Sequence, residues 1–128
     1  METRIVADTP VAGKPAEDVG VGRKNDAGKP PLHLIPPEFL YALAEILDFG
    51  QKKYAPRNWE KGLDWSRVYR AALGHLYDWF MQKGPDPETG KSHLWHAACC
   101  VMFLVCYEIR QTGTDDRPSP AEPTPGQR

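Results

Sequence analysis

Two pairs of polar residues with identical spacing lie inside apolar stretches on either side of a short turn. His75 and Asp78 form the first pair, and His93 and His96 form the second. The turn between the stretches, residues 84–90, contains two glycines and two prolines, which end one helix before the next begins. Residues three apart lie on one face of a helix. The pattern therefore predicts two consecutive helices with both polar pairs at the interface between them.

Apolar residues at helical spacing predict three helices in the central part of the chain. In the first, they recur at steps of three and four residues between Pro36 and Gly50, and a proline pair suits the first turn of a helix. The candidate N-caps of the second and third helices are Asp64 or Ser66, and Thr89 or Ser92, respectively. No pair of strands is indicated. We predict an all-α fold, a small helical bundle of three to four main helices.

Both ends of the chain have compositions typical of disorder. Residues 1–22 mix Pro, Gly, Ala and acidic side chains without an apolar period, and residues 112–128 are rich in Pro, Thr, Asp and Glu. We therefore expect two disordered tails and a folded domain at residues 23–111. The domain would open with an extended strip, residues 24–37, whose prolines exclude a helix. We expect this strip to lie along the surface of the bundle.

The length and charge of the chain restrict its class. A length of 128 residues suits one small domain. The formal net charge of -1 makes nucleic acid or a membrane surface an unexpected partner. The three cysteines fall in one apolar segment, as expected for reduced thiols in a cytoplasmic protein, and the apolar run 97–105 is too short to span a bilayer. Because the ordered region can bury only limited area, we expect a homo-oligomer.

The two polar pairs together offer a metal-binding set. The predicted ligands of a divalent ion are His75, Asp78, His93 and His96, with coordination positions left open for water or phosphate. A bound cation lowers the pKa of its water and neutralises phosphate oxygens, as hydrolysis of a phosphoanhydride requires. The alternative is that these histidines are only hydrogen-bonded within the core.

The turn between the helices adds two acids to this set. Asp86 and Glu88 are the candidate catalytic residues, because a carboxylate at the mouth of a metal site can act as general acid or base, or supply a further ligand. The alternative is a solvated turn whose carboxylates cap the third helix.

A basic and aromatic loop at residues 51–62 is suited to a nucleotide. Such a mixture can bind a polyphosphate, stack on a base and recognise its edge by hydrogen bonds. The candidate substrate-binding residues are Lys52, Lys53, Tyr54, Asn58, Trp59 and Lys61, together with Lys29 in the strip. The alternative is a surface loop whose aromatic residues cover one end of the bundle.

Four segments carry a resemblance to a known family: KNDAGKPPLHLIPP, FGQKKYAPRNWEKG, RAALGHLYDWF and DPETGKSHLWHAACCVMFL. In this order they resemble the bacteriophage-type domain at the N-terminus of dATP/dGTP diphosphohydrolases, over most of residues 23–107. The resemblance implies an all-helical domain linked to hydrolysis of deoxypurine triphosphates to the monophosphate and pyrophosphate. That chemistry is similar to that of MazG-like nucleotide pyrophosphohydrolases, whose helical bundles hold magnesium with carboxylate pairs.

Imidazoles take the place of three of the four carboxylates here. They favour manganese, cobalt, iron or zinc, whereas magnesium prefers oxygen ligands. We expect a divalent ion, Mg²⁺ or Mn²⁺ first, with Zn²⁺ or Co²⁺ as alternatives.

The sequence thus predicts a metal-dependent nucleotide pyrophosphohydrolase that converts dATP or dGTP to the monophosphate plus pyrophosphate. A purine deoxynucleoside triphosphate would be its partner, in the host cytoplasm if the protein is encoded by a phage. The alternative is a non-catalytic phage accessory module, a helical bundle that binds a nucleotide or a protein partner. A nucleic-acid-binding module is the least favoured reading, because the net charge is close to zero.

Overall fold

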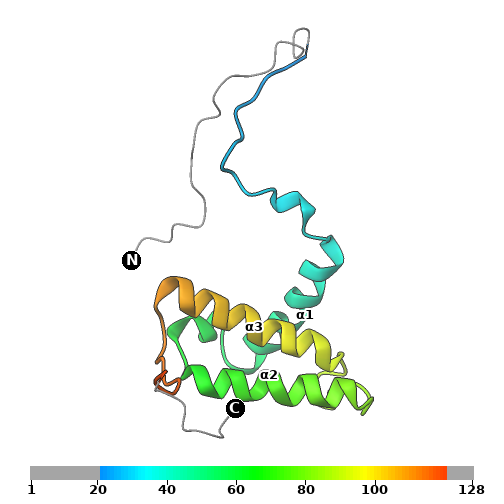
Figure 1. Cartoon of the computed structure of the whole chain (residues 1–128). Helices are drawn as coiled ribbons and strands as arrows, with labels where there is room; N and C mark the ends of the chain where they lie inside the picture. Colours follow the sequence, from blue (N-terminus) through cyan, green and yellow to red (C-terminus); the bar gives the residue numbers. More distant parts are fainter. Residues whose placement is uncertain (1–20, 121–128) are drawn as a thin grey trace, which may run out of the picture.

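The computed structural model describes residues 21–120, and all regular structure in this part of the chain is helical (Figure 1). The elements are the short 3₁₀ helices η2 (Leu32–Leu34) and η3 (Asn58–Lys61) and the α-helices α1 (Pro37–Lys53), α2 (Trp65–Phe80) and α3 (His93–Arg110). The predicted small all-α bundle is confirmed. The expectations for residues 1–20 and 121–128 lie outside the described residues. Between residues 21 and 120, no helix has the length and apolar character needed to cross a membrane.

Helix α1 begins where the proline pair predicts and packs on α3. Pro37 occupies its first turn, where a missing N–H costs no hydrogen bond. Leu43 and Ile46 are buried against Cys99 of α3. The helix continues past Gly50 to Lys53, because the backbone N–H of Tyr54 still donates to the Gly50 carbonyl.

Helices α2 and α3 run antiparallel and form the main packed unit (Figure 1). Each starts after one of its two predicted caps: Asp64 precedes α2, and Ser92 precedes α3 and accepts a hydrogen bond from the Leu94 N–H. Val68 of α2 and Tyr107 of α3 lie in one buried cluster at the end of the pair that is far from the turn. This packing holds the helix faces that carry the histidines against each other.

The loop between α1 and α2 is fixed to α3 by its tryptophan. The Trp59 ring stacks on Phe103, with ring centroids 4.6 Å apart and an interplanar angle of 17°. The Tyr107 hydroxyl donates to the Trp59 carbonyl at 2.6 Å, and Arg110 forms an ion pair with Glu60 at 2.7 Å. The loop thus covers one end of the bundle, as the alternative reading of its aromatic residues proposes.

Residues 112–118 turn back onto the start of α2 instead of leaving the bundle as the expected tail. The Trp65 N–H donates to the Thr114 carbonyl at 3.0 Å, and the Trp65 indole donates to the Thr112 carbonyl at 2.9 Å. Asp116 accepts a hydrogen bond from the Ser66 N–H at 2.9 Å, so it caps α2 from a distance of 50 residues. Composition alone indicated a tail because these bonds are made mostly by the backbone.

A glycine permits this return of the chain. Gly113 has a φ of +77°, and a Cβ atom at this position would lie 2.4 Å from the Leu63 carbonyl oxygen. Both the conformation and the space therefore require glycine.

The strip before α1 also differs from expectation. It extends away from α2 and α3, together with the first turns of α1 (Figure 1). Nearly all of residues 21–41 are exposed. The physical reason is that α1 contacts α3 through Leu43 and Ile46, in its middle, so its N-terminal end points past the bundle.

Candidate functional site

The turn that joins α2 to α3 is organised around one carboxylate. Asp86 Oδ1 accepts hydrogen bonds from the backbone N–H groups of Glu88 at 2.9 Å and Thr89 at 3.0 Å. The Asp86 N–H donates to the Lys91 carbonyl, and Gly90, with a φ of +72°, closes the turn by donating to the Asp86 carbonyl. The sequence builds this turn because Asp side chains bond to backbone N–H groups two residues further on.

Burial alone would raise the pKa of Asp86. The hydrogen bonds from Thr89 and Glu88 and the nearby imidazoles of His96 and His75 outweigh it, so the pKa lies below its ordinary value. Asp86 is therefore a stable carboxylate that faces the histidines.

The histidines of α2 and α3 meet beside this turn. His75 and His93 face each other with their Nδ1 atoms 2.9 Å apart. The ring of His96 stacks on that of His75, with centroids 4.7 Å apart and an interplanar angle of 18°. Burial lowers the pKa of His75, and the two neighbouring imidazoles lower it further. Burial also lowers the pKa of His96, against the opposing effect of Asp86. Both rings are held in the neutral form, which a metal ion requires of an imidazole ligand.

Three of these side chains have the spacing of a metal-binding set. Among residues 21–120, His75, Asp86 and His93 each offer a ligand atom, and these atoms all lie within 4.8 Å of one another. Two nitrogens that are each about 2.1 Å from one ion lie about 3.0 Å apart at a right angle and about 3.4 Å apart at the tetrahedral angle. The observed separation of 2.9 Å is close to these distances and is also that of an ordinary hydrogen bond between the two rings. The donor set thus fits a divalent transition-metal ion.

The other two predicted ligands lie next to this set but face elsewhere. Asp78 Oδ2 is 4.0 Å from His93 Nε2, the ring nitrogen on the edge away from His75, and Asp78 Oδ1 pairs with Lys83 at 3.2 Å. This distance is too long for a direct hydrogen bond, although a carboxylate behind the second ring nitrogen is a common partner of metal-binding histidines. His96 Nε2 lies 2.7 Å from the Thr89 hydroxyl. Because the ring of His96 is nearly parallel to that of His75, their lone pairs run side by side and do not converge.

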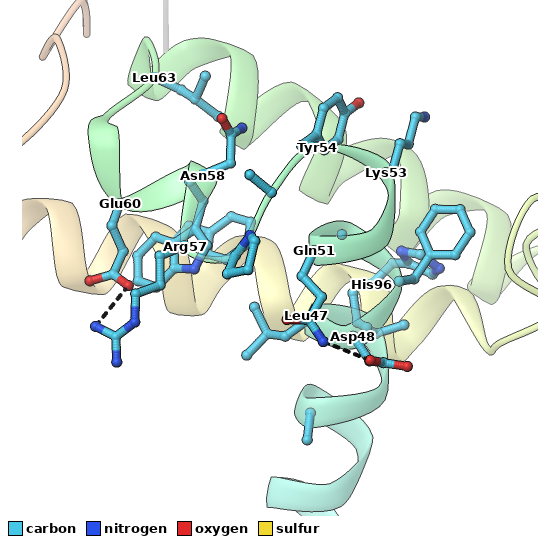
Figure 2. Close-up of a pocket in the computed structure, with 18 of the residues that line it drawn as sticks. Leu47, Asp48, Gln51, Lys53, Tyr54, Arg57, Asn58, Glu60, Leu63 and His96 are labelled. Atoms are coloured by element: carbon cyan, nitrogen blue, oxygen red, sulfur yellow. Dashed lines mark hydrogen bonds and ion pairs between the residues drawn. The ribbon is translucent and has the colours of Figure 1, made fainter.

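A pocket of about 800 Å³ opens beside His96, whereas His75, His93 and Asp86 do not line it (Figure 2). Its walls are the second half of α1, the loop 54–63 and α3. Its charged lining residues are Asp48, Lys53, Arg57, Glu60, Glu88 and Arg110. His96 lies at the end near Lys53 and joins the pocket to the imidazole cluster (Figure 2). The volume is within the range of sites for small molecules.

The structure brings some of the predicted substrate-binding residues to this pocket and leaves others outside it. The four that line the pocket are Lys53, Tyr54, Asn58 and Trp59. Lys52 points to Asp48, with which it pairs at 3.0 Å, and Lys61 is exposed at the end of η3. Lys29 belongs to the strip that leaves the bundle (Figure 1).

The two predicted catalytic acids lie in different parts of the site. Asp86 belongs to the metal-binding set, whereas Glu88 lines the pocket and pairs with Lys53 at 2.8 Å. The Glu88 side chain is 55% exposed, so its carboxylate can be reached from the pocket.

Sequence reasoning missed two pocket residues, Glu60 and Arg110. Arg110 forms an ion pair with Glu60, and its guanidinium lies over the Trp59 ring, 5.6 Å from the centroid. Helical spacing contains the signal, because position 110 lies on the same face of α3 as Phe103 and Tyr107, which hold the loop.

Comparison with known proteins gives a family. The family described as "dATP/dGTP diphosphohydrolase, N-terminal" matches residues 19–117. A protein of Salmonella phage PMBT28 named dATP/dGTP diphosphohydrolase is 39% identical over 96 residues, which are 75% of this chain and 33% of the phage protein. The chain thus spans about a third of the length of that relative. No solved structure matches the chain. The match over residues 19–117 covers every helix of the bundle, the imidazole cluster and the pocket, and this chain belongs to the dATP/dGTP diphosphohydrolase N-terminal domain family.

Proposed function

We propose that this chain is a metal-dependent nucleotide pyrophosphohydrolase that converts dATP or dGTP and water to the monophosphate and pyrophosphate. The observation that carries the proposal is the convergence of His75, His93 and Asp86 beside a pocket of nucleotide size. The name of the phage relative supports the substrate class.

His75, His93 and Asp86 would hold the ion, and Asp78 would orient His93. Two imidazoles with one carboxylate favour Mn²⁺ or Co²⁺ over Mg²⁺. Such an ion neutralises phosphate oxygens and makes a water molecule a better nucleophile.

The pocket residues would hold the nucleotide. Lys53 and Arg57 supply positive charge for the phosphates, and the Asn58 amide suits the edge of a purine. The faces of the Trp59 ring are already taken by Phe103 and Arg110. A phosphate group would compete with Glu88 for Lys53, because the two side chains form an ion pair. Substrate binding would thereby release the Glu88 carboxylate.

Glu88 is then the general base that accepts a proton from the attacking water. Asp86 is less suited to this role, because backbone hydrogen bonds occupy its Oδ1 and keep its pKa low. The water oxygen would form a bond to the α-phosphorus, and pyrophosphate would leave.

The test is to incubate the purified chain with each deoxynucleoside triphosphate and with Mn²⁺, Co²⁺, Mg²⁺ or Zn²⁺, and to measure monophosphate and pyrophosphate by anion-exchange chromatography. We expect dATP or dGTP to be hydrolysed with Mn²⁺ or Co²⁺, and not with an excess of chelator. Glu88→Gln should reduce kcat about a hundredfold with nucleotide binding retained. An absence of pyrophosphate with every ion and nucleotide would contradict the proposal.

A non-catalytic nucleotide-binding module is the second candidate. It is favoured by the finding that the chain spans only 33% of the phage relative. It predicts that calorimetry detects binding of dATP or dGTP while the same sample releases no pyrophosphate.

A further inference from the structure

The N-terminal part of the folded chain exposes a run of apolar side chains that no part of residues 21–120 covers. We call residues 32–41, which comprise η2 and the first turns of α1, the arm. Its large apolar side chains are each between 43% and 72% exposed: Leu32, Leu34, Ile35, Phe39, Leu40 and Tyr41. Phe39 and Leu40 lie on the same face of α1 as Leu43, which is only 9% exposed because it packs on α3. The core-facing stripe of α1 therefore continues into the arm, where it has no partner.

A second apolar surface lies on the outside of the α2 and α3 pair. We call it the outer face. On α2 it is formed by Tyr69, Leu73, Leu76 and Phe80, and on α3 by Leu94, Val101 and Val105, each between 39% and 74% exposed. These residues recur at steps of three, four and seven along each helix, so each set forms a stripe. The two stripes meet at a groove of about 300 Å³ lined by Tyr69, Val101 and Val105.

The charges beside the two surfaces are opposite. The arm carries Glu38, and Arg70 lies beside the outer face on α2, whose groove is itself lined by one charge of each sign, Glu108 and Arg117. Glu38 and Arg70 are exposed, and neither forms an ion pair with another residue between positions 21 and 120.

We propose that two copies of this chain form a two-fold dimer in which the arm of each copy packs on the outer face of the other. Arm-on-arm contact would leave both outer faces in water, and face-on-face contact would leave both arms in water. Reciprocal exchange covers both surfaces in both copies and brings Glu38 toward Arg70. The exchange as a whole is isologous, so the assembly closes at two copies and leaves neither surface free to bind a further copy.

The exposed area is sufficient for a stable dimer. An aromatic side chain presents roughly 150–250 Å² and an aliphatic one less, so about half-exposed sets of this size amount to on the order of 1,000 Å² per copy. A standard interface buries about 1,200–2,000 Å² in total, or about 800 Å² per partner. A monomeric protein rarely exposes apolar patches of more than a few hundred Å².

The test is analytical ultracentrifugation of the full chain between about 1 and 100 μM, a range in which a micromolar dimer dissociates. We expect a dimer at the upper end of the range. Leu40→Glu in the arm and Leu73→Glu in the outer face should each raise the dissociation constant at least tenfold. Ala71→Glu is the matched control, because position 71 is exposed on the opposite side of α2 and should leave the dimer unchanged. Circular dichroism checks that each variant is folded.

Mixing the two variants separates this arrangement from its rivals. In a heterodimer, the intact arm of the Leu73→Glu chain packs on the intact outer face of the Leu40→Glu chain, and both substitutions fall in the other contact. The mixture should therefore contain dimers at concentrations where each variant alone is monomeric. A monomeric wild-type chain, a dimer sensitive to only one of the two variants, open-ended assembly, or a mixture that stays monomeric would each overturn the proposal. The inference does not depend on the proposed hydrolysis, because none of these outcomes involves a nucleotide.

Discussion

His75 and His93 come from different helices and present the same ring nitrogen, Nδ1, to each other at 2.9 Å. Two neutral imidazoles can make this contact only if one Nδ1 carries the proton and the other accepts it. A separation of about 3 Å is also that of two ligand nitrogens on one ion. The pair is thus satisfied without a metal, and to bind one the protonated ring has to shift its proton from Nδ1 to Nε2.

Removal of either imidazole should strongly weaken metal binding. We expect His75→Ala and His93→Ala to weaken Mn²⁺ binding at least about a hundredfold, because each removes one of three ligands. Isothermal titration calorimetry measures the affinity. His33→Ala is the control, since His33 is exposed in η2 and away from the cluster. Unchanged Mn²⁺ affinity in a folded His75→Ala chain would contradict the assignment.

Asp78→Asn tests the role of the carboxylate behind His93. Because Asp78 lies 4.0 Å from His93 Nε2, we expect Mn²⁺ affinity to fall about 10- to 100-fold with little change in Tm. Lys83→Gln breaks the ion pair of Asp78 without touching His93 and should leave the affinity unchanged. If Asp78→Asn lowered Tm and nucleotide binding together, the non-catalytic module would be favoured.

The acid sensitivity of the metal-free protein follows from its neutral histidines. The pKa values of His75 and His96 are lowered from 6.5 by burial, so below about pH 6.5 the unfolded chain binds more protons than the folded one. The free energy of unfolding should therefore change little between this pH and about pH 8, where the cysteines begin to ionise in the unfolded chain, and fall as the pH drops toward the folded-state pKa values of the histidines. Asp86, with a pKa below 3.8, does not titrate in this window.

Urea denaturation in the presence of chelator, at about pH 7.5, 6.5 and 5.5, measures this effect. His96→Gln should reduce the dependence on pH. Stability that increased on acidification would show that the histidines are charged in the folded chain.

The loop tryptophan should contribute to stability. Trp59→Ala removes the stack on Phe103, and we expect it to lower the free energy of unfolding by about 2–4 kcal/mol. Trp59→Phe keeps an aromatic ring on Phe103 and should cost about 1 kcal/mol. Thermal and urea unfolding give both values. An equal loss in the two variants would show that the stacking does not matter.

Gly113 and Gly84 form a matched pair, because both have positive φ but only one is crowded. A Cβ at Gly84, with a φ of +85°, meets no atom within 4 Å, whereas one at Gly113 would lie 2.4 Å from the Leu63 carbonyl oxygen. We expect Gly84→Ala to cost about 1–2 kcal/mol of stability and Gly113→Ala to cost about 1–3 kcal/mol more. Equal losses in urea unfolding would indicate that residues 112–118 leave α2 in solution.

The sequence was sufficient for the helices and for the meeting of the histidines. Apolar spacing, the proline pair and the caps at Asp64 and Ser92 predict where each helix begins, and the spacing of three residues predicts that His75 and His93 face one interface. It could not assign the carboxylate. Asp78 and Asp86 are equally suitable in composition, and only the folded turn decides which one faces the imidazoles.

The return of residues 112–118 and the course of the arm were also beyond sequence reasoning. The first depends on backbone bonds between Trp65 and Thr114 and on a single glycine conformation, neither of which has a compositional signal. The second depends on where α1 crosses α3, which is set by packing at Leu43 and Ile46 rather than by the prolines of the strip.

The cap that Asp116 provides for α2 determines where this domain can be cut. A chain shortened to Gln111, the limit that composition suggests, would leave the Ser66 N–H and the Trp65 indole without their acceptors. The first turn of α2 would then fray. The loop before α2, which forms one wall of the pocket, would lose its attachment at this end. Expression of the isolated domain, or fusion of another protein to its C-terminus, should therefore keep every residue up to Pro118.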